Sequence, residues 1–115
     1  MAFKTKKDLI KYCLTYPDVY EDYPFHDTEW AVIRHRKNKK VFAWIYTREE
    51  KTCVNVKCDP ALVGSLRNKA GYFPAYHMNK ENWISILLDG SVPMDEIQEL
   101  VALSYHFTLP KTKNS

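Results

Sequence analysis

The chain has 115 residues, of which 45% are hydrophobic and 27% charged, so it is sized for one domain that needs neither a disulfide framework nor a metal to fold. Its three cysteines form no C-x-x-C pair and predict free thiols in a reducing, cytoplasmic setting. No apolar run approaches the roughly 18 residues of a membrane span. We therefore expect a monomer with no membrane partner.

The net charge of +3 is unevenly distributed along the chain. Residues 33–57 carry eight basic and two acidic side chains, whereas residues 12–32 carry five acids and no base. A weak global charge with one basic block predicts a local anionic partner rather than general adhesion to polyanions.

The first predicted helix begins at Thr5, whose hydroxyl can cap the backbone N–H of Asp8, and it ends before Pro17. Residues 18–28 are predicted to form an acidic, aromatic loop. Three strands follow at residues 30–36, 41–47 and 52–57, joined by short polar turns. In the first of these turns Asn38 is expected to adopt the left-handed conformation that tight hairpins need.

Asp59 and Pro60 predict the start of a second helix, which Gly71 is expected to stop. Two short strands, at about 73–78 and 83–88, are expected to be joined across residues 79–82. A last helix begins near Pro93, with one buried face made by Ile97, Leu100, Val101, Ser104 and Phe107. The predicted fold class is α+β, a two-layer αβββαββα arrangement with an antiparallel sheet and the helices packed on one face. Residues 1–109 form the single domain, and residues 110–115 are predicted to be a disordered tail.

Catalytic motifs are missing from the sequence. The four histidines are scattered without an H-x-x-x-H pair, no serine lies in a G-x-S-x-G elbow, and three glycines are too sparse for a phosphate loop. Cys58, beside Asp59, could have a lowered thiol pKa near a helix start, although a packed thiol is the favoured interpretation. We expect a non-enzymatic protein with no catalytic residue, cofactor or metal.

Two turns are candidate binding sites. In the first, Arg34 and Arg36 share one strand face and Lys37, Lys39 and Lys40 lie at the tip, an arrangement suited to phosphates. On charge alone, a solvated turn that protects a sheet edge is the favoured alternative. In the second turn, three polar side chains could bind an anion, a base edge or a partner backbone, or could instead hydrogen-bond their own turn; they are His77, Asn79 and Lys80. Aromatic residues along the strands could stack nucleobases on an open sheet, but most should belong to the core.

The segment Tyr76-His77-Met78-Asn79-Lys80-x-x-Trp83 resembles the hallmark of the MmcQ/YjbR family. Further matches lie along nearly the whole chain, at Pro17, Tyr23-Pro24-Phe25, Trp30, Lys40-Val41-Phe42-Ala43, Val54-Asn55-Val56-Lys57-Cys58-Asp59-Pro60 and Ser104-Tyr105. Ala75 departs from the pattern, because a glycine free to adopt positive φ is expected there. The resemblance implies a CyaY-like or secretion-chaperone-like α+β fold and a bacterial DNA-binding role through two protruding hairpins, a double wing.

The leading hypothesis is therefore a cytoplasmic, non-enzymatic DNA-binding protein with largely non-specific phosphate contacts. The contact residues are expected to be Arg34, Arg36, Lys37, Lys39, Lys40, Lys57, His77, Asn79 and Lys80. The alternative is a protein-interaction module, of a chaperone or adaptor kind, that uses the open sheet face. A third possibility is a small-ligand or metal-binding role by analogy with the CyaY-like fold, motivated by the acids Asp18, Glu21, Asp22, Asp27 and Glu29.

Overall fold

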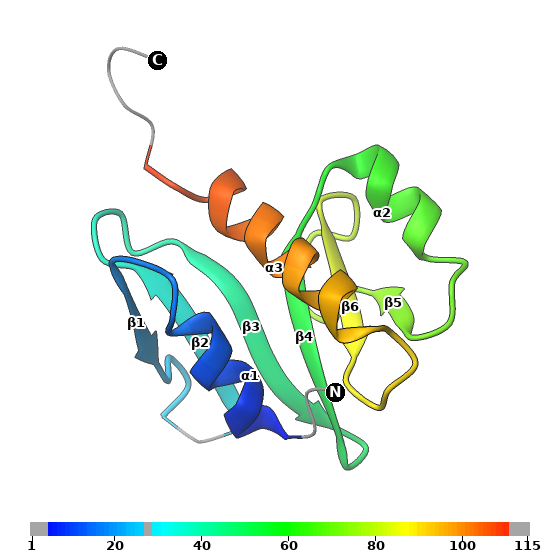
Figure 1. Ribbon diagram of the computed structural model, residues 1–115, viewed down its shortest axis with the longest axis horizontal. Coiled ribbons are helices and arrows are strands. Elements are labelled where there is room, and N and C mark those ends of the chain that lie inside the picture. The colour runs from blue at the N-terminus through cyan, green and yellow to red at the C-terminus, as the bar shows by residue number, and fades with distance from the viewer. Residues whose placement is uncertain (1–4, 27–28, 111–115) are drawn as a thin grey trace.

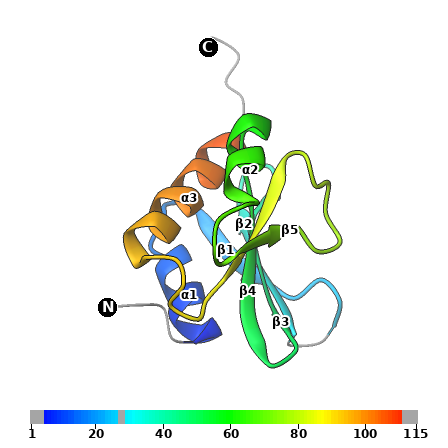
Figure 2. The same cartoon turned by 90° about the vertical axis from the view of Figure 1, so that its right-hand side faces the viewer.

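Three helices cover one face of a single six-stranded sheet in the computed structural model, which describes residues 5–26 and 29–110 (Figures 1 and 2). The strand order is β1-β2-β3-β4-β6-β5, and every neighbouring pair is antiparallel. The elements are α1 (Lys6–Cys13), β1 (Val19–Asp22), β2 (Trp30–His35), β3 (Val41–Arg48), β4 (Lys51–Lys57), α2 (Pro60–Leu66), β5 (Tyr72–Pro74), β6 (Trp83–Leu87) and α3 (Met94–Phe107). The α+β class with helices on one face is confirmed.

The predicted element order was one strand short, because Val19–Asp22 forms β1 inside the segment expected to be a loop. Two of its four residues are acidic, and aspartate and glutamate are rare in strands. The strand is held by pairing with β2, from Val19 opposite His35 to Asp22 opposite Val32. Tertiary pairing therefore outweighs a weak local preference.

Local capping signals are confirmed where both partners lie close in sequence. Thr5 and Asp8 form the expected capping box at the start of α1, and the Asp59 side chain accepts a hydrogen bond from the Ala61 N–H at the start of α2. Three expectations were wrong. The α2 helix ends at Leu66, well before Gly71; Lys39, not Asn38, has the positive φ of the first turn; and Phe107 is exposed on α3.

The core lies between the helices and the first face of the sheet. Leu9 and Cys13 of α1, together with Val63 of α2, are buried against the sheet, and α3 contributes the largest share, namely Ile97, Leu100, Val101 and Tyr105. All three cysteines are free and buried, as expected, and burial raises the pKa of the Cys13 thiol to about 12.

Ser104 of α3 bridges the two central strands where their ladder ends. The paired positions of β3 and β4 stop at Trp44 and Asn55, two residues short of Phe42 and Lys57. The Ser104 hydroxyl fills that gap: it donates to the Phe42 carbonyl at 2.6 Å and accepts from the Lys57 backbone N–H at 2.8 Å. The adjacent Tyr105 hydroxyl donates to the Pro17 carbonyl at 2.9 Å. Helix α3 thus substitutes for missing strand pairing.

The turn between β2 and β3 is fastened to the end of α3. The His35 ring nitrogen Nε2 lies 2.8 Å from the Thr108 hydroxyl, and the Asn38 amide donates to the Thr108 carbonyl at 2.9 Å. The Asn38 side-chain oxygen also accepts the Lys40 N–H at 3.0 Å. These contacts hold the lysine-bearing turn in a fixed position.

Stability should fall in mild acid because His35 is buried. Burial lowers its pKa below the ordinary 6.5, against a smaller opposing effect of a Tyr105 backbone hydrogen bond. As the pH falls below about 6.5, the unfolded chain binds a proton that the folded chain does not, so unfolding becomes easier. We expect the free energy of unfolding, measured by urea denaturation, to drop between pH 7.5 and pH 5.5, by up to about 1.4 kcal/mol per pH unit. In the His35→Gln variant the same comparison should show a smaller drop; an equal drop would assign the effect to other groups.

No helix in the described part of the chain is long and apolar enough to cross a membrane. Residues 110–115 were predicted to be a disordered tail, and residues 111–115 of it lie outside the part of the chain that the structure describes.

Candidate nucleic-acid interface

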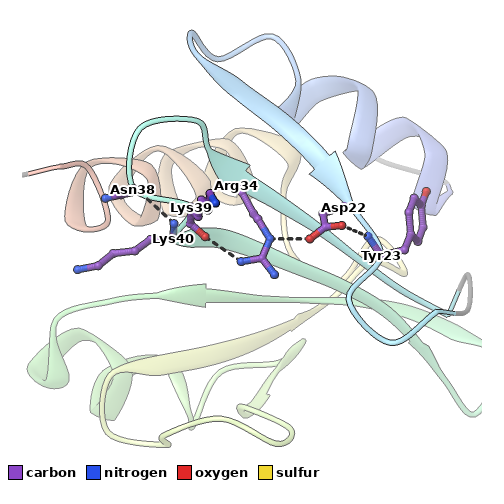
Figure 3. Close-up of polar contacts among 6 residues, drawn as sticks. All are labelled: Asp22, Tyr23, Arg34, Asn38, Lys39 and Lys40. Carbon is purple, nitrogen blue, oxygen red and sulfur yellow. Dashed lines mark hydrogen bonds and ion pairs between the residues drawn. The ribbon is translucent and has the colours of Figure 1, made fainter.

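The turn between β2 and β3, residues 36–40, is called here the basic hairpin. It is closed by backbone hydrogen bonds from the His35 N–H to the Lys40 carbonyl and from the Lys39 N–H to the His35 carbonyl, both at 2.9 Å. The register shifts between Ile33 and Arg34, which are paired with Ala43 and Val41, so Phe42 of β3 is the extra residue of a bulge beside the turn. Lys39 has a φ of 63° and directs its carbonyl back toward the sheet (Figure 3).

Two of the predicted phosphate ligands are engaged within the protein. The Arg34 guanidinium donates through Nε to Asp22 Oδ2 and through Nη1 to the Lys39 carbonyl, each at 2.8 Å (Figure 3). The hydrogen bond from Arg34 is also the main reason why the Asp22 pKa lies below its ordinary value. The Arg36 guanidinium lies 5.6 Å from the centre of the Tyr20 ring, a cation–π contact that leaves its donors exposed. Arg34 therefore supports the hairpin rather than presenting its full charge.

The three lysines of the basic hairpin are exposed and carry uncompensated charge. In the described part of the chain, the ion pairs join Arg34 to Asp22 and Lys69 to Glu96, and neither involves Lys37, Lys39 or Lys40. Lys57, at the end of β4, is half-buried and also has no acidic partner among those pairs. Free ammonium groups on a fixed turn suit phosphate contacts.

The second predicted turn is the connection between β5 and β6, residues 75–82, and it is longer than expected. Asn79 serves the turn itself, because its side-chain oxygen accepts the Glu81 N–H at 2.8 Å and its carbonyl accepts the Trp83 N–H at 3.1 Å. His77 is exposed, has a φ of 61°, and lies with its ring 3.9 Å from that of Tyr76. The left-handed residue is thus His77, while Ala75 is buried without positive φ.

Lys80 is exposed, but the adjacent Glu81 is exposed too and offsets its charge. The Lys80 carbonyl accepts a hydrogen bond from Arg67 of the turn after α2, which anchors the connection. The second turn therefore contributes polar groups but little net positive charge.

Both turns lie at the same end of the sheet (Figure 1). This follows from the strand order, because β3 starts where the basic hairpin ends, β4 runs back to that end, and β6 starts beside the end of β4. Strand β4 separates β3 from β6, and β3 and β4 are no longer paired beyond Trp44 and Asn55, so the two turns stand apart at this end. Lys57 lies between them, opposite Trp83.

The acidic segment offers no metal site among the residues that the structure describes. Asp22 is bound to Arg34 and Glu21 accepts the Tyr23 hydroxyl, while Asp27 lies outside the described residues. No group of three histidine, cysteine, aspartate or glutamate side chains in residues 5–26 and 29–110 could hold a metal ion. The reactive-thiol alternative for Cys58 is wrong, because burial raises its pKa to about 12 and the Asp59 charge acts in the same direction.

The second sheet face, opposite the helices, carries a set of contacting rings. We call Phe25, Trp30, Trp44, Tyr46, Tyr76 and His77 the aromatic cluster. Trp30 and Tyr46 stack at 4.4 Å between ring centres, and Trp30 meets Tyr76 at 6.2 Å and Trp44 at 6.1 Å. The alternation of side chains along strands predicts that the rings at 30, 44 and 46 share one face. Phe25 and Tyr76 lie in connections between strands, and the sequence near them does not predict where those connections run.

Asn55 explains how the second turn reaches this face. This buried β4 side chain donates to the Tyr76 carbonyl at 2.9 Å and so holds the connection over the sheet. The face expected to be open is therefore partly covered, by residues 75–82 and by residues 23–26 after β1 (Figure 2).

This geometry defines a single α+β domain with an antiparallel six-stranded sheet. Helices lie on one face of the sheet and two looped connections lie on the other. The YjbR family model matches residues 14–107. The chain belongs to the YjbR family.

Relatives and solved structures agree with this membership. The chain is 34% identical over 115 residues to the Bacillus subtilis protein described as uncharacterized protein YyaQ, covering 90% of this chain and 98% of that one. It is 30% identical over 102 residues to uncharacterized protein YjbR of Escherichia coli K12, covering 88% and 84%. A crystal structure from Pseudomonas syringae superposes with a TM-score of 0.83 at 34% identity, over 91% of this chain and 99% of that chain. One from Deinococcus radiodurans gives 0.81 at 28% identity, over 97% and 88%.

Proposed function

We propose that the protein is a non-enzymatic, cytoplasmic DNA-binding protein whose basic hairpin contacts the phosphate backbone. The observation that carries the proposal is the hairpin itself. Lys37, Lys39 and Lys40 are exposed, form no ion pair within residues 5–26 and 29–110, and lie on a turn fixed by His35 and Asn38. Arg36 and Lys57 extend the positive charge along the same end of the sheet. Contacts of this kind position a protein on DNA without reading its sequence.

The second turn has a lesser role in this proposal. Asn79 is occupied by its own turn, so Lys80 and His77 remain as the groups that could touch the backbone beside the hairpin. Two turns at one end of a sheet, one strongly basic and one nearly neutral, would make an uneven double wing.

Removing the hairpin charge should weaken DNA binding in a salt-dependent way. We choose Lys37→Gln, Lys39→Asn and Lys40→Gln together, because asparagine tolerates the left-handed conformation at position 39. If all three lysines contact phosphates, the slope of log affinity against log salt should fall by about 2.7 for a duplex. Fluorescence anisotropy with a labelled 20-base-pair duplex at several salt concentrations measures it.

The matched control removes three charges from the helix side, at Lys7, Lys11 and Lys69. Lys69 gives up only an exposed pair with Glu96 at 3.8 Å, so stability should hardly change. The control should keep the wild-type salt slope. If both variants lose duplex affinity equally, the effect is one of net charge and not of the hairpin. If the wild type has no measurable duplex affinity at low salt, the proposal is refuted.

The second candidate function is a protein-interaction module on the second sheet face. The observation that favours it is exposed apolar surface there, since Phe25 and Phe73 are 54% and 47% exposed. A protein partner held by these rings should bind with little dependence on salt, and the hairpin variant should leave its affinity unchanged. A peptide-library selection against the wild type and against Phe25→Ala/Phe73→Ala distinguishes this function from DNA binding.

A further inference from the structure

The aromatic cluster on the second sheet face has a buried inner part and an exposed outer part. Its inner rings, including Tyr46, pack on Cys53 and Leu87 as a small separate core. The outer rings remain accessible: Phe25 is 54% exposed, His77 is exposed, and Trp30, Trp44 and Tyr76 are half-buried. Phe25 still lies 6.5 Å from Trp44, with the two rings tilted by 31°. Phe25 and His77 therefore form the most exposed part of the cluster.

A hollow of about 270 Å³ adjoins the cluster on the same face. Tyr46 belongs to both. The lining also includes the cations Arg48 and Lys51, the carboxylate of Glu49, and Phe73 with Pro74 of β5. This volume lies just below the range of small-molecule ligand sites, about 300–1,000 Å³, so the hollow can take only a small group.

Positive charge borders these rings. The Arg48 guanidinium lies 4.2 Å from the centre of the Tyr76 ring, and it also lines the hollow. Neither Arg48 nor Lys51 takes part in the ion pairs found among residues 5–26 and 29–110. Lys57 lies on this face too, two positions beyond Asn55 on the same side of β4. Rings interleaved with unpaired cations complement a chain that alternates flat bases with phosphates.

We propose that this face binds a single-stranded nucleic acid, whose unpaired bases stack on the aromatic cluster and in the hollow beside Phe73. The inference deepens the DNA-binding function proposed above and rests on it. Duplex bases are stacked on one another inside the helix, so exposed aromatic rings gain nothing from them, whereas every unpaired base has a free π-face. The strand's phosphates contact Arg48 and Lys57, and the basic hairpin receives the continuation of the strand beyond the face.

The test removes the two most exposed phenyl rings on the face and keeps the cations. Because Phe25 and Phe73 are about half exposed, Phe25→Ala/Phe73→Ala should fold, and Phe25→Tyr/Phe73→Tyr keeps the rings as a rescue variant. The matched control is Phe107→Ala, which removes a phenyl ring of 49% exposure from α3 on the helix side. Each protein is titrated with a 12-nucleotide thymidine oligomer, a uridine oligomer of equal length and a duplex, at one salt concentration.

We expect wild-type protein to bind the single strands more tightly than the duplex. The double alanine variant should lose about ten-fold or more in single-strand affinity with its duplex affinity unchanged, while the tyrosine and Phe107 variants match the wild type. Equal affinity for DNA and RNA supports stacking alone, and a preference for one identifies a sugar contact in addition.

Two outcomes overturn the inference and are distinguishable. In the first outcome, the wild type binds duplex and the hairpin variant does not, but the double alanine change leaves single-strand affinity unaffected. The stacking site is then wrong and the DNA-binding function stands. If no oligomer binds at low salt, both fail, and peptide binding that depends on Phe25 and Phe73 would assign the face to a protein partner.

Discussion

Replacing Gly71 by alanine should destabilise the protein by about 3 kcal/mol. Gly71 has a φ of +89°, which costs an alanine roughly 1–2 kcal/mol. A Cβ there would also lie 2.6 Å from Val92 Cγ2 and 3.0 Å from Ser91 Cβ, and such overpacking typically costs about 1–3 kcal/mol. Urea denaturation followed by circular dichroism measures the free energy of unfolding.

The control for this prediction is Gly64→Ala, within α2. A Cβ at that position would have no heavy atom within 4 Å, and alanine favours a helix over glycine by about 0.5–1 kcal/mol. The two glycine variants should therefore shift stability in opposite directions. A loss below about 1 kcal/mol for Gly71→Ala would contradict the close approach of the residues before α3.

The Ser104→Ala variant should lose about 2–4 kcal/mol of stability. The change leaves both the Phe42 carbonyl and the Lys57 backbone N–H without their partner, in a part of the sheet where direct pairing has already ended. Each unsatisfied buried group costs about 1–3 kcal/mol. The same urea experiment measures the loss, and amide hydrogen exchange should show faster exchange at Lys57.

Ser65→Ala serves as the comparison, because Ser65 is an exposed residue of α2 and its replacement should stay within about 0.5 kcal/mol of wild type. Should Ser104→Ala prove equally mild, the bridging role of Ser104 would be wrong, and β3 and β4 must pair directly at that end of the sheet.

Much of the fold could be predicted because its signals are local. The Thr5 capping box, the Asp59–Pro60 helix start and the three strands between Trp30 and Lys57 each depend on residues close in sequence. Strand β1 was missed because its stability comes from pairing with β2, and its acidic composition is typical of a loop.

The candidate site was predicted less well, because residues far away in the sequence decide whether a charged side chain forms an ion pair within the protein. Arg34 was expected to contact phosphate, yet it pairs with Asp22, twelve positions earlier on the strand that was missed. Lys37 and Lys40 belong to the same basic block of the sequence as Arg34, but they take no part in the ion pairs among residues 5–26 and 29–110. The path of residues 75–82 over the second face depends on one buried amide, Asn55, which has no local signature.

Several residues that carried the family resemblance hold the fold together. Ser104 bridges two strands, Tyr105 fastens α3 to Pro17, and Trp30 packs against both Tyr46 and Tyr76. The binding residues proposed for the hairpin lie outside these contacts. We therefore expect the proposed binding variants to fold as the wild type does.

The most direct test of DNA binding through the basic hairpin is a titration of ¹⁵N-labelled protein with a short duplex at low salt, followed by amide chemical-shift changes. At 13.6 kDa the chain gives well-resolved spectra. The hairpin proposal predicts the largest chemical-shift changes at residues 36–40 and smaller ones at Lys57 and Lys80. Added salt should abolish all of these changes. Changes confined to α1 and α3, or no change at excess duplex, would contradict it.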